Sequence, residues 1–285
     1  MYGHTKAGTP FYESATYLDS YNVLMTTHQL SSSGNPVTLA ILGTGNNYSN
    51  SPGTMVAIHD VVAYAGFVSG GSTPDLAIAH LSAPLPPPHG SSINENAGPV
   101  SLSPMAFASV SQGQTIWGAG FGFYGTLGGG LNLQDGNSRG WNAPVVLNSH
   151  GFDANSYFAA NFNRDSTLGA MNGMGAQLDS GCPWYDQSGN LVGISVAANN
   201  SAGYTIVERL SDPTILAWIQ ANLFVPPTLQ LQRAGTNVVL TWSGTFTLQT
   251  ATNRPGSFAD VPGAASPYTN AVTADPQRFF RLRLN

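Results

Sequence analysis

Glycine and proline divide this chain into many short apolar segments, and that division constrains the fold more than any other feature of the sequence. The 285 residues include 33 glycines and 19 prolines. The segments between them have the length of strands and are rich in β-branched and aromatic residues. They cover residues 21–28, 36–43, 54–67, 75–85, 114–122, 190–198 and 203–210. We therefore expect an all-β fold of short strands and tight turns.

One segment, residues 211–223, has the pattern of a helix. Ser211 is placed to cap its first turn, and Pro213 suits the first helical positions. The apolar residues that fall on one face are Ile215, Leu216, Trp218, Ile219 and Leu223. This spacing predicts a single amphipathic helix packed on a β-rich body.

The composition changes near residue 224. Residues 1–223 carry 4 basic and 12 acidic side chains, whereas residues 224–285 carry 5 and 2. After the linker FVPP the sequence alternates in the manner of strands, at 236–242, 245–252 and 278–284. We predict a main domain over residues 1–223 and a small β-sandwich-like module over residues 228–285.

Charge and cysteine content exclude several classes of function. The net charge is −5 with a single lysine, Lys6, so we expect no nucleic-acid partner. Cys182 is the only cysteine, which excludes an intramolecular disulfide and a multi-cysteine zinc site, and we expect neither a metal nor a cofactor. No apolar run reaches the roughly 20 residues of a membrane helix. The opening residues MYGHTKAGTP carry no leader pattern, so we expect either an intracellular protein or one whose leader is absent from this chain.

Three side chains suited to nucleophilic hydrolysis are spread along the main domain. Such chemistry needs a hydroxyl, a base that takes its proton and a group that orients the base. His28 ends the segment at 21–28, and Asp75 opens the segment at 75–85. Ser180 lies in the glycine-rich loop GMGAQLDSGCP, shortly before the segment at 190–198. The order is therefore His, Asp, Ser.

Six motifs around these residues resemble the chymotrypsin/trypsin-type serine proteases. They occur in the family's order, from about residue 11 to residue 223, and are VLMTTH, DLAIAHLSAPL, IWGAGFG, LDSGCP, LVGIS and LAWIQANL. The resemblance implies two six-stranded antiparallel β-barrels, over about 1–90 and about 98–210, with a closing helix at 211–223. The connector PLPPPHG at 84–90 would lie in the crossover between the barrels.

The resemblance also implies a role for each site residue. His28 is the general base and acid, Asp75 orients it, and Ser180 attacks the carbonyl carbon. The backbone N–H groups of Leu178 and Ser180 form the oxyanion hole. Ser195 matches the residue that commonly supports the buried aspartate.

The same alignment suggests which substrates the pocket takes. Met174 stands six residues before the nucleophile, where trypsin-like enzymes place an acid, so recognition of lysine or arginine is disfavoured. Ala197 and Ala202 fall near the pocket walls and Gln177 at its rim. These residues predict a preference for small or medium apolar side chains.

Two departures from the family pattern keep a second hypothesis open. Leu178 stands where the family has a glycine, at a position whose backbone must turn its N–H inward. The chain also contains no Ile/Val-Val-Gly-Gly stretch whose free amine would pair with Asp179, so that acid needs another partner.

Our first hypothesis is a secreted or cell-surface serine endopeptidase that acts on protein or peptide substrates, with a C-terminal module that binds a surface or matrix ligand. The alternative is a catalytically degenerate protease scaffold that serves as a binding or adhesion protein. A weaker third reading is a protease that cleaves itself near residues 225–227.

Overall fold

The computed structural model describes residues 2–5, 10–32, 35–43, 53–68, 73–86, 107–126, 130–137, 139–147, 157–161, 173–253, 256–272 and 277–284. It divides the chain into two compact units, Met1–Phe224 and Val225–Asn285. The division falls within the linker FVPP. Within the described residues, no helix is long and apolar enough to cross a membrane.

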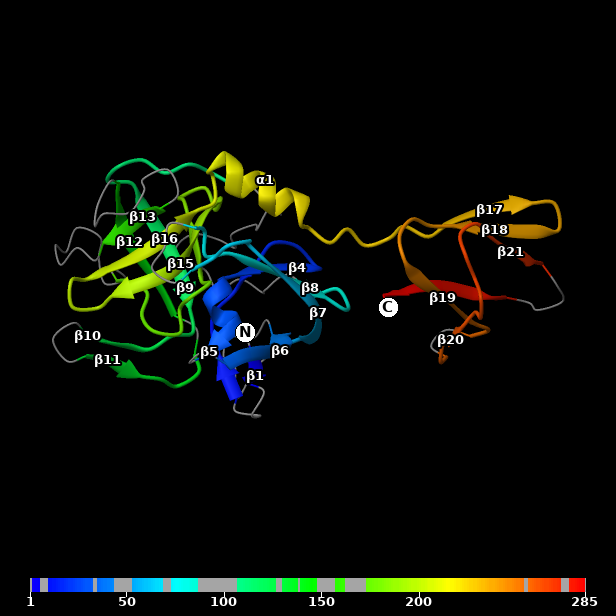
Figure 1. Cartoon of the computed structure of the whole chain (residues 1–285), viewed down its shortest axis with the longest axis horizontal. Coiled ribbons are helices and arrows are strands. Elements are labelled where there is room, and N and C mark those ends of the chain that lie inside the picture. The colour runs from blue at the N-terminus through cyan, green and yellow to red at the C-terminus, as the bar shows by residue number, and fades with distance from the viewer. Residues whose placement is uncertain are drawn as a thin grey trace. The chain divides into compact units, whose positions relative to one another are not determined.

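The first half of the larger unit is an eight-stranded antiparallel sheet (Figure 1). Its strands run in the order β2-β1-β6-β7-β8-β4-β3, and β5 pairs with β6. Their bounds are β1 (Tyr2–Thr5), β2 (Pro10–Tyr12), β3 (Thr16–Tyr17), β4 (Asn22–Met25), β5 (Ser31–Ser32), β6 (Asn35–Gly43), β7 (Met55–Ala63) and β8 (Ala77–Leu81). Every residue of β4 and β8 is buried, so these two strands form the centre of this half.

The second half is a closed six-stranded barrel in the order β12-β13-β16-β15-β14-β9. The barrel strands are β9 (Thr115–Gly120), β12 (Arg139–Val146), β13 (Tyr157–Asn161), β14 (Pro183–Tyr185), β15 (Leu191–Asn199) and β16 (Tyr204–Arg209). A separate hairpin joins β10 (Tyr124–Thr126) to β11 (Gly130–Leu133). Apolar side chains fill the barrel, among them the fully buried Ile116, Trp184, Val192 and Val207.

Helix α1 (Pro213–Ala221) ends this unit. Asp212, rather than the predicted Ser211, caps it: its Oδ1 accepts the N–H groups of Thr214 at 2.8 Å and Ile215 at 3.2 Å. The buried Ile215 and Ile219 pack in one cluster with Leu24 and Ile78 of the first half and Ile194 of the second. The helix therefore seals the junction at which the two halves meet.

A histidine ties the C-terminus of this helix to the first half. His80 of β8 has Nδ1 2.5 Å from Asp60 Oδ1 and Nε2 2.8 Å from the carbonyl oxygen of Asn222, the C-cap residue. A carbonyl oxygen only accepts, so Nε2 donates to it, while Nδ1 faces the Asp60 carboxylate. Asn22 adds a second tie, since its Oδ1 accepts the N–H of Phe224 at 2.7 Å.

The predicted all-β fold with one closing helix is confirmed, with one local difference. The segment at 21–28 is not a strand throughout. Strand β4 ends at Met25 and a 3₁₀ helix, η1 (Thr27–Leu30), follows, so His28 lies in a helical turn. Residues 87–90 of the connector PLPPPHG lie outside the described residues.

The C-terminal unit consists of two three-stranded antiparallel sheets. One has the order β17-β18-β21, with bounds Gln230–Ala234, Asn237–Thr241 and Tyr268–Ala271. The other has the order β20-β19-β22, with bounds Ala259–Asp260, Phe246–Ala251 and Phe279–Leu284. Each sheet contributes one fully buried leucine, Leu240 from β18 and Leu248 from β19.

Candidate active site

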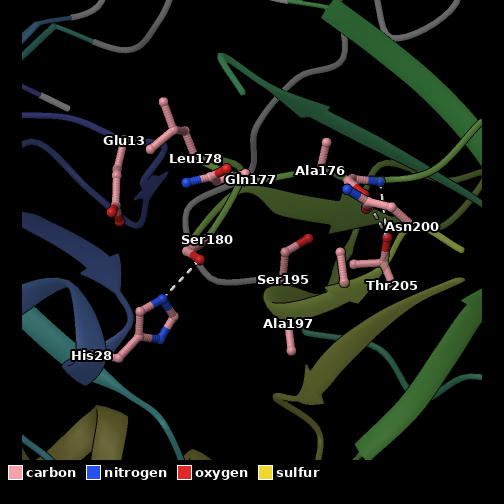
Figure 2. Close-up of a pocket in the computed structure, with 12 residues that line it drawn as sticks. Glu13, His28, Ala176, Gln177, Leu178, Ser180, Ser195, Ala197, Asn200 and Thr205 are labelled. Atoms are coloured by element: carbon pink, nitrogen blue, oxygen red, sulfur yellow. Dashed lines mark hydrogen bonds between the residues drawn. The ribbon is translucent and has the colours of Figure 1, made fainter. Parts of the chain in front are cut away.

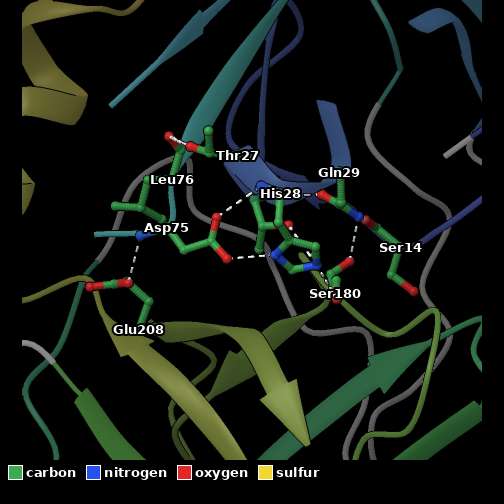
Figure 3. A network of polar contacts seen from close by, with 9 residues as sticks. Ser14, Thr27, His28, Gln29, Asp75, Leu76, Ser180 and Glu208 are labelled. Atoms are coloured by element: carbon green, nitrogen blue, oxygen red, sulfur yellow. Dashed lines mark hydrogen bonds and ion pairs between the residues drawn. The ribbon is translucent and has the colours of Figure 1, made fainter. Parts of the chain in front are cut away.

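The structure brings His28, Asp75 and Ser180 together at the junction of the two halves (Figure 3). His28 comes from η1, Asp75 from the segment before β8, and Ser180 from the loop before β14. His28 Nδ1 lies 2.5 Å from Asp75 Oδ2, and His28 Nε2 lies 2.8 Å from Ser180 Oγ. The three side chains therefore form one continuous chain of hydrogen bonds, as the sequence order predicts.

Asp75 fixes the orientation and the tautomer of the imidazole. Its Oδ1 accepts the backbone N–H of His28 at 3.0 Å, while its Oδ2 faces Nδ1 of the same residue. Thr27 Oγ1 donates to the carbonyl of Leu76 at 2.6 Å, which holds η1 against the segment that carries Asp75. Because Nδ1 carries the proton that Asp75 accepts, Nε2 is left to accept the proton of Ser180.

Opposing effects act on the pKa of His28, and the net shift is upward. Burial lowers the pKa because it disfavours the imidazolium. The hydrogen bond to Asp75, the charge of Asp75 and the charge of Glu13 all raise it. The site therefore stabilises the protonated imidazole that forms when the base takes up a proton.

Gln29 links the base to the nucleophile through its side-chain amide. It is only 1% exposed, and its Nε2 donates to the carbonyl oxygens of Ser180 at 2.7 Å and Ser14 at 3.0 Å. Its Oε1 accepts the N–H of Thr26 at 2.8 Å. One side chain thus fixes η1, the segment at residue 14 and the loop of Ser180 relative to one another.

Asp179 finds its partners in the backbone. Its Oδ1 accepts the N–H of Gly122 at 2.8 Å, and its Oδ2 accepts the N–H of Ala176 at 2.8 Å. Burial raises the pKa of this carboxyl to about 7, although these two hydrogen bonds and one from Ser14 act to lower it. These backbone N–H groups are the partners of Asp179 that the sequence alone did not identify.

Two glycines make the close approach of Asp179 possible. A Cβ at Gly120 would lie 2.0 Å from Asp179 Oδ1, and one at Gly122 would lie 2.4 Å from its Cγ. Any larger residue at either position would displace the carboxyl group. The segment GAGFG that ends β9 is therefore shaped around this acid.

Leu178 adopts the glycine-like backbone that the sequence comparison demands. Its φ is 72°, and it is the only non-glycine residue with a positive φ among those described. The preceding carbonyl, that of Gln177, accepts the N–H of Phe123 at 2.8 Å. A trans peptide points its N–H opposite to its C=O, so the N–H of Leu178 faces away from Phe123.

A pocket of about 320 Å³ adjoins the triad (Figure 2). Its lining residues are Glu13, His28, Gly175, Ala176, Gln177, Leu178, Ser180, Ser195, Ala197, Ala198, Asn200 and Thr205. Gln177 and Ala197 thus line the pocket, as do both residues of the predicted oxyanion hole.

The two other predicted pocket residues, Met174 and Ala202, do not line it. The hairpin from β15 to β16 is short, and Ala202 lies exposed at its tip, where its N–H donates to Asn199 Oδ1 at 2.9 Å. Thr205 takes the place expected for Met174, because its Oγ1 accepts the N–H of Gly175 at 2.8 Å and lies at the pocket wall.

The structure gives Ser195 a different role from the predicted one. Its Oγ accepts the indole N–H of Trp184 at 2.8 Å and lies 3.1 Å from the sulfur of Cys182, so it is engaged within the barrel. Glu208 holds the backbone at Asp75, since its Oε2 accepts the backbone N–H of Asp75 at 3.1 Å. Cys182 is fully buried, and burial raises the pKa of its thiol.

Sequence reasoning missed several residues of this site, among them Glu13, Gln29 and Thr205. Gln29 directly follows the predicted base in the sequence, and this position could have identified it as a residue of the site. Glu13 and Thr205 reach the pocket only through the pairing of distant strands. Among the described residues, no group of three or more histidine, cysteine or acidic side chains is arranged to hold a metal ion.

Comparison with known proteins identifies the family. The model of the trypsin family, described as Trypsin, matches residues 11–219. No curated protein matches the chain. Among solved structures, the inactivated protease paralogue S-I1 of the scabies mite is similar with a TM-score of 0.52 and 15% identity, covering 77% of this chain and 91% of that one. That likeness shows the chymotrypsin-like fold, and the match over residues 11–219 shows that the chain belongs to the trypsin family.

Proposed function

We propose that this chain is an active serine endopeptidase that hydrolyses peptide bonds through an acyl-enzyme. Ser180 Oγ attacks the carbonyl carbon while His28 Nε2 takes its proton, and a tetrahedral intermediate forms. The protonated His28 then gives that proton to the leaving amine, which departs and leaves an ester on Ser180. Water attacks the ester by the same route, with His28 again as the base.

The observation that carries this proposal is the unbroken chain from Asp75 through His28 to Ser180, with separations of 2.5 Å and 2.8 Å. A general base must lie within hydrogen-bond reach of the proton it removes, and His28 Nε2 does. The upward shift in the pKa of His28 also suits a base that must hold a proton during the reaction.

Two backbone N–H groups are available to stabilise the oxyanion. Leu178 and Ser180 both line the pocket, and neither backbone N–H donates to an acceptor within the described part of the chain. Donors held in place before the reaction stabilise developing negative charge without reorganisation, and one such donor is worth roughly 3 kcal/mol of barrier. The left-handed backbone of Leu178 shows that its side chain does not prevent this conformation.

The pocket supports a preference for small or medium uncharged side chains before the scissile bond. Figure 2 shows Ala176 and Ala197 near Asn200 and Thr205, and among the described residues that line the pocket the only carboxylate is that of Glu13, on the other side of Ser180. A lysine or arginine side chain would be buried there without a partner, which is costly.

A fluorophosphonate probe tests the proposal. It bonds covalently to a serine only when a base and an oxyanion hole activate that serine. We expect one label per chain, located at Ser180 by peptide mapping, and none on the Ser180→Ala variant with an unchanged circular dichroism spectrum. Labelling of neither protein, with both well folded, would overturn the proposal.

A binding protein on a degenerate protease scaffold is the second candidate, and Leu178 is the observation that favours it. This candidate predicts a folded protein that the probe does not label and that hydrolyses no peptide ester. The same experiment therefore decides between the two candidates.

We also propose that the protein acts outside the cell or at its surface, because a content of 8% charged residues with one lysine suits extracellular proteins. Fractionation of the source cells checks this, and recovery in the cytosol alone would contradict it. That the C-terminal module binds a surface or matrix ligand stays a prediction, for which retention of residues 225–285 on the cell envelope is the measurement.

A further inference from the structure

Glu13 is an acid at the active site that the mechanism above does not use. Its side chain lines the same pocket as His28 and Ser180 (Figure 2). Its charge acts on His28 and raises the pKa of that base. It is thus a further carboxylate near the base, and it faces the cleft rather than the opposite side of the imidazole.

The backbone holds Glu13 firmly beside the nucleophile loop. The next residue, Ser14, donates both its N–H and its hydroxyl to the carbonyl of Leu178, at 3.1 Å and 3.2 Å. Ser14 also accepts a hydrogen bond from Gln29, and a Cβ on Gly181 would lie only 2.7 Å from its carbonyl oxygen. The position of this carboxyl relative to Ser180 is therefore set by contacts on both sides.

Glu13 lies at the end of the cleft that receives the leaving group. Figure 2 shows Glu13 on one side of Ser180 and Asn200 and Thr205 on the other. The acyl part of the substrate occupies the Thr205 end, as proposed above, so the chain that leaves with the new amine extends past Ser180 toward Glu13. We propose that Glu13 selects substrates with a positively charged side chain on the first or second residue after the scissile bond.

Electrostatics favour a cation at this place. Burial raises the pKa of Glu13, with Asp75 adding to the rise, while Gln29 and His28 lower it. A substrate cation would stabilise the ionised form of a carboxyl that is partly shielded from water. The domain around it is also acidic, with 4 basic and 12 acidic side chains over residues 1–223. This inference rests on the proposed endopeptidase activity and adds a substrate class to it.

An acyl-transfer experiment isolates this end of the cleft. The full chain is acylated with 4-nitrophenyl esters of N-acetylated alanine, valine and leucine. The acyl-enzyme then reacts either with water or with an added amine, and the ratio of the two products is measured. The amine attacks the Ser180 ester, forms an amide and releases the serine hydroxyl, which reverses peptide cleavage. Argininamide and citrullinamide are the two amines, because they share size and α-amine chemistry and differ in side-chain charge. Alanyl-argininamide and alanyl-citrullinamide test the second position.

We expect the wild-type protein to transfer the acyl group to the arginine compounds about fivefold more readily than to the citrulline compounds, at one or both positions. In Glu13→Gln this ratio should fall to about one, and in Glu13→Asp it should stay above one. Asp212→Asn is the matched control, because it removes one negative charge from the same domain while asparagine still caps a helix. Its ratio should equal that of the wild type.

Two failures are distinguishable. A burst of nitrophenol followed by equal transfer to the charged and neutral amines would overturn the role of Glu13 and leave the endopeptidase proposal standing. A preference for the arginine compounds that persists in Glu13→Gln would also overturn the role of Glu13 and leave the endopeptidase proposal standing. The absence of any burst with all three esters would overturn the proposed activity and this inference with it.

Discussion

The Oδ1 atom of Asp179 lies 2.8 Å from the backbone nitrogen of Gly122, in a space that only a glycine at position 122 leaves open. This hydrogen bond and the one from the N–H of Ala176 give the carboxylate of Asp179 two uncharged donors. Neutral donors compensate a buried carboxylate less completely than an opposite charge does, and the pKa of Asp179 accordingly rises to about 7.

The stability of the larger unit should therefore depend on the ionisation of Asp179. The folded-state pKa of about 7 lies above the ordinary value of 3.8, so the folded protein binds this proton more tightly than the unfolded chain. Its contribution to stability is complete below pH 4 and is lost as the pH rises through 7. Relative to Asp179→Asn, the wild type should lose ~2 kcal/mol or more of unfolding free energy between pH 5 and pH 8. Urea denaturation at several pH values measures this. A difference that does not change with pH would contradict the prediction.

Asp75→Asn should reduce both the rate and the pH midpoint of activity. His28 acts as a base only when neutral, and its raised pKa moves the onset of activity to higher pH than for an ordinary histidine. Removing the charge of Asp75 leaves the lowering effect of burial, so the midpoint of the acid limb should move down. The loss of the correct tautomer should lower kcat by roughly 10³-fold or more. The measurement is kcat/KM against pH on a peptide ester, and an unshifted midpoint would show that Asp75 does not tune His28.

Position 178 should prefer glycine to alanine. At φ 72° a Cβ crowds the backbone, and alanine bears that cost whereas glycine does not. We expect Leu178→Gly to be about 1 kcal/mol more stable than Leu178→Ala. At Ala217, an exposed position of helix α1, the opposite preference is expected: Ala217→Gly should be about 1 kcal/mol less stable than the wild type, because glycine is unfavourable within a helix. Thermal and urea denaturation of these variants provide the comparison, and alanine ahead of glycine at 178 would rule out the left-handed backbone.

Gln29→Ala should weaken both the fold and the catalytic alignment. The change removes the donor from the carbonyl oxygens of Ser14 and Ser180 and the acceptor for the N–H of Thr26. The hydrogen bonds to Ser14 and from Thr26 are buried. Unsatisfied buried groups cost about 1–3 kcal/mol each, so we expect a total loss of about 3 kcal/mol in unfolding free energy. Gln114→Ala is a suitable control, because the Gln114 side chain accepts one exposed N–H at 2.9 Å and should matter by less than about 1 kcal/mol. Equal effects in the two variants would show that Gln29 is an ordinary polar side chain.

The sequence predicted the elements whose signals are local. Short apolar segments rich in β-branched and aromatic residues indicated the strands, and Pro213 with the apolar face that follows it indicated the helix. The residues of the predicted triad could be singled out because each has a distinctive neighbourhood along the chain. Even so, the local signal at the helix start was ambiguous, since Ser211 and Asp212 are both good caps and only Asp212 has its side chain turned toward the first turn.

Features that depend on pairing between distant segments were not predictable in the same way. Thr205 replaces Met174 at the pocket wall because β16 brings its hydroxyl to Gly175. Ser195 faces Trp184 rather than Asp75 because β14 pairs with β15 inside the barrel. Asp60 contacts His80 across the β7–β8 pair, at a register irregularity that the sequence does not reveal.

The tie between His80 and Asn222 has a consequence for the order of events during synthesis. Asp60 and His80 leave the ribosome long before residue 222, and until that residue follows, the histidine lacks the carbonyl acceptor at its second nitrogen. The same holds for Asn22, whose amide waits for Phe224. The strands of the first half of the protease domain can thus pair early. The hydrogen bonds of His80 and Asn22 described here form only after the last residues of the domain have been synthesised. Nascent chains released shortly before residue 222 should therefore lack both of these ties to the first half.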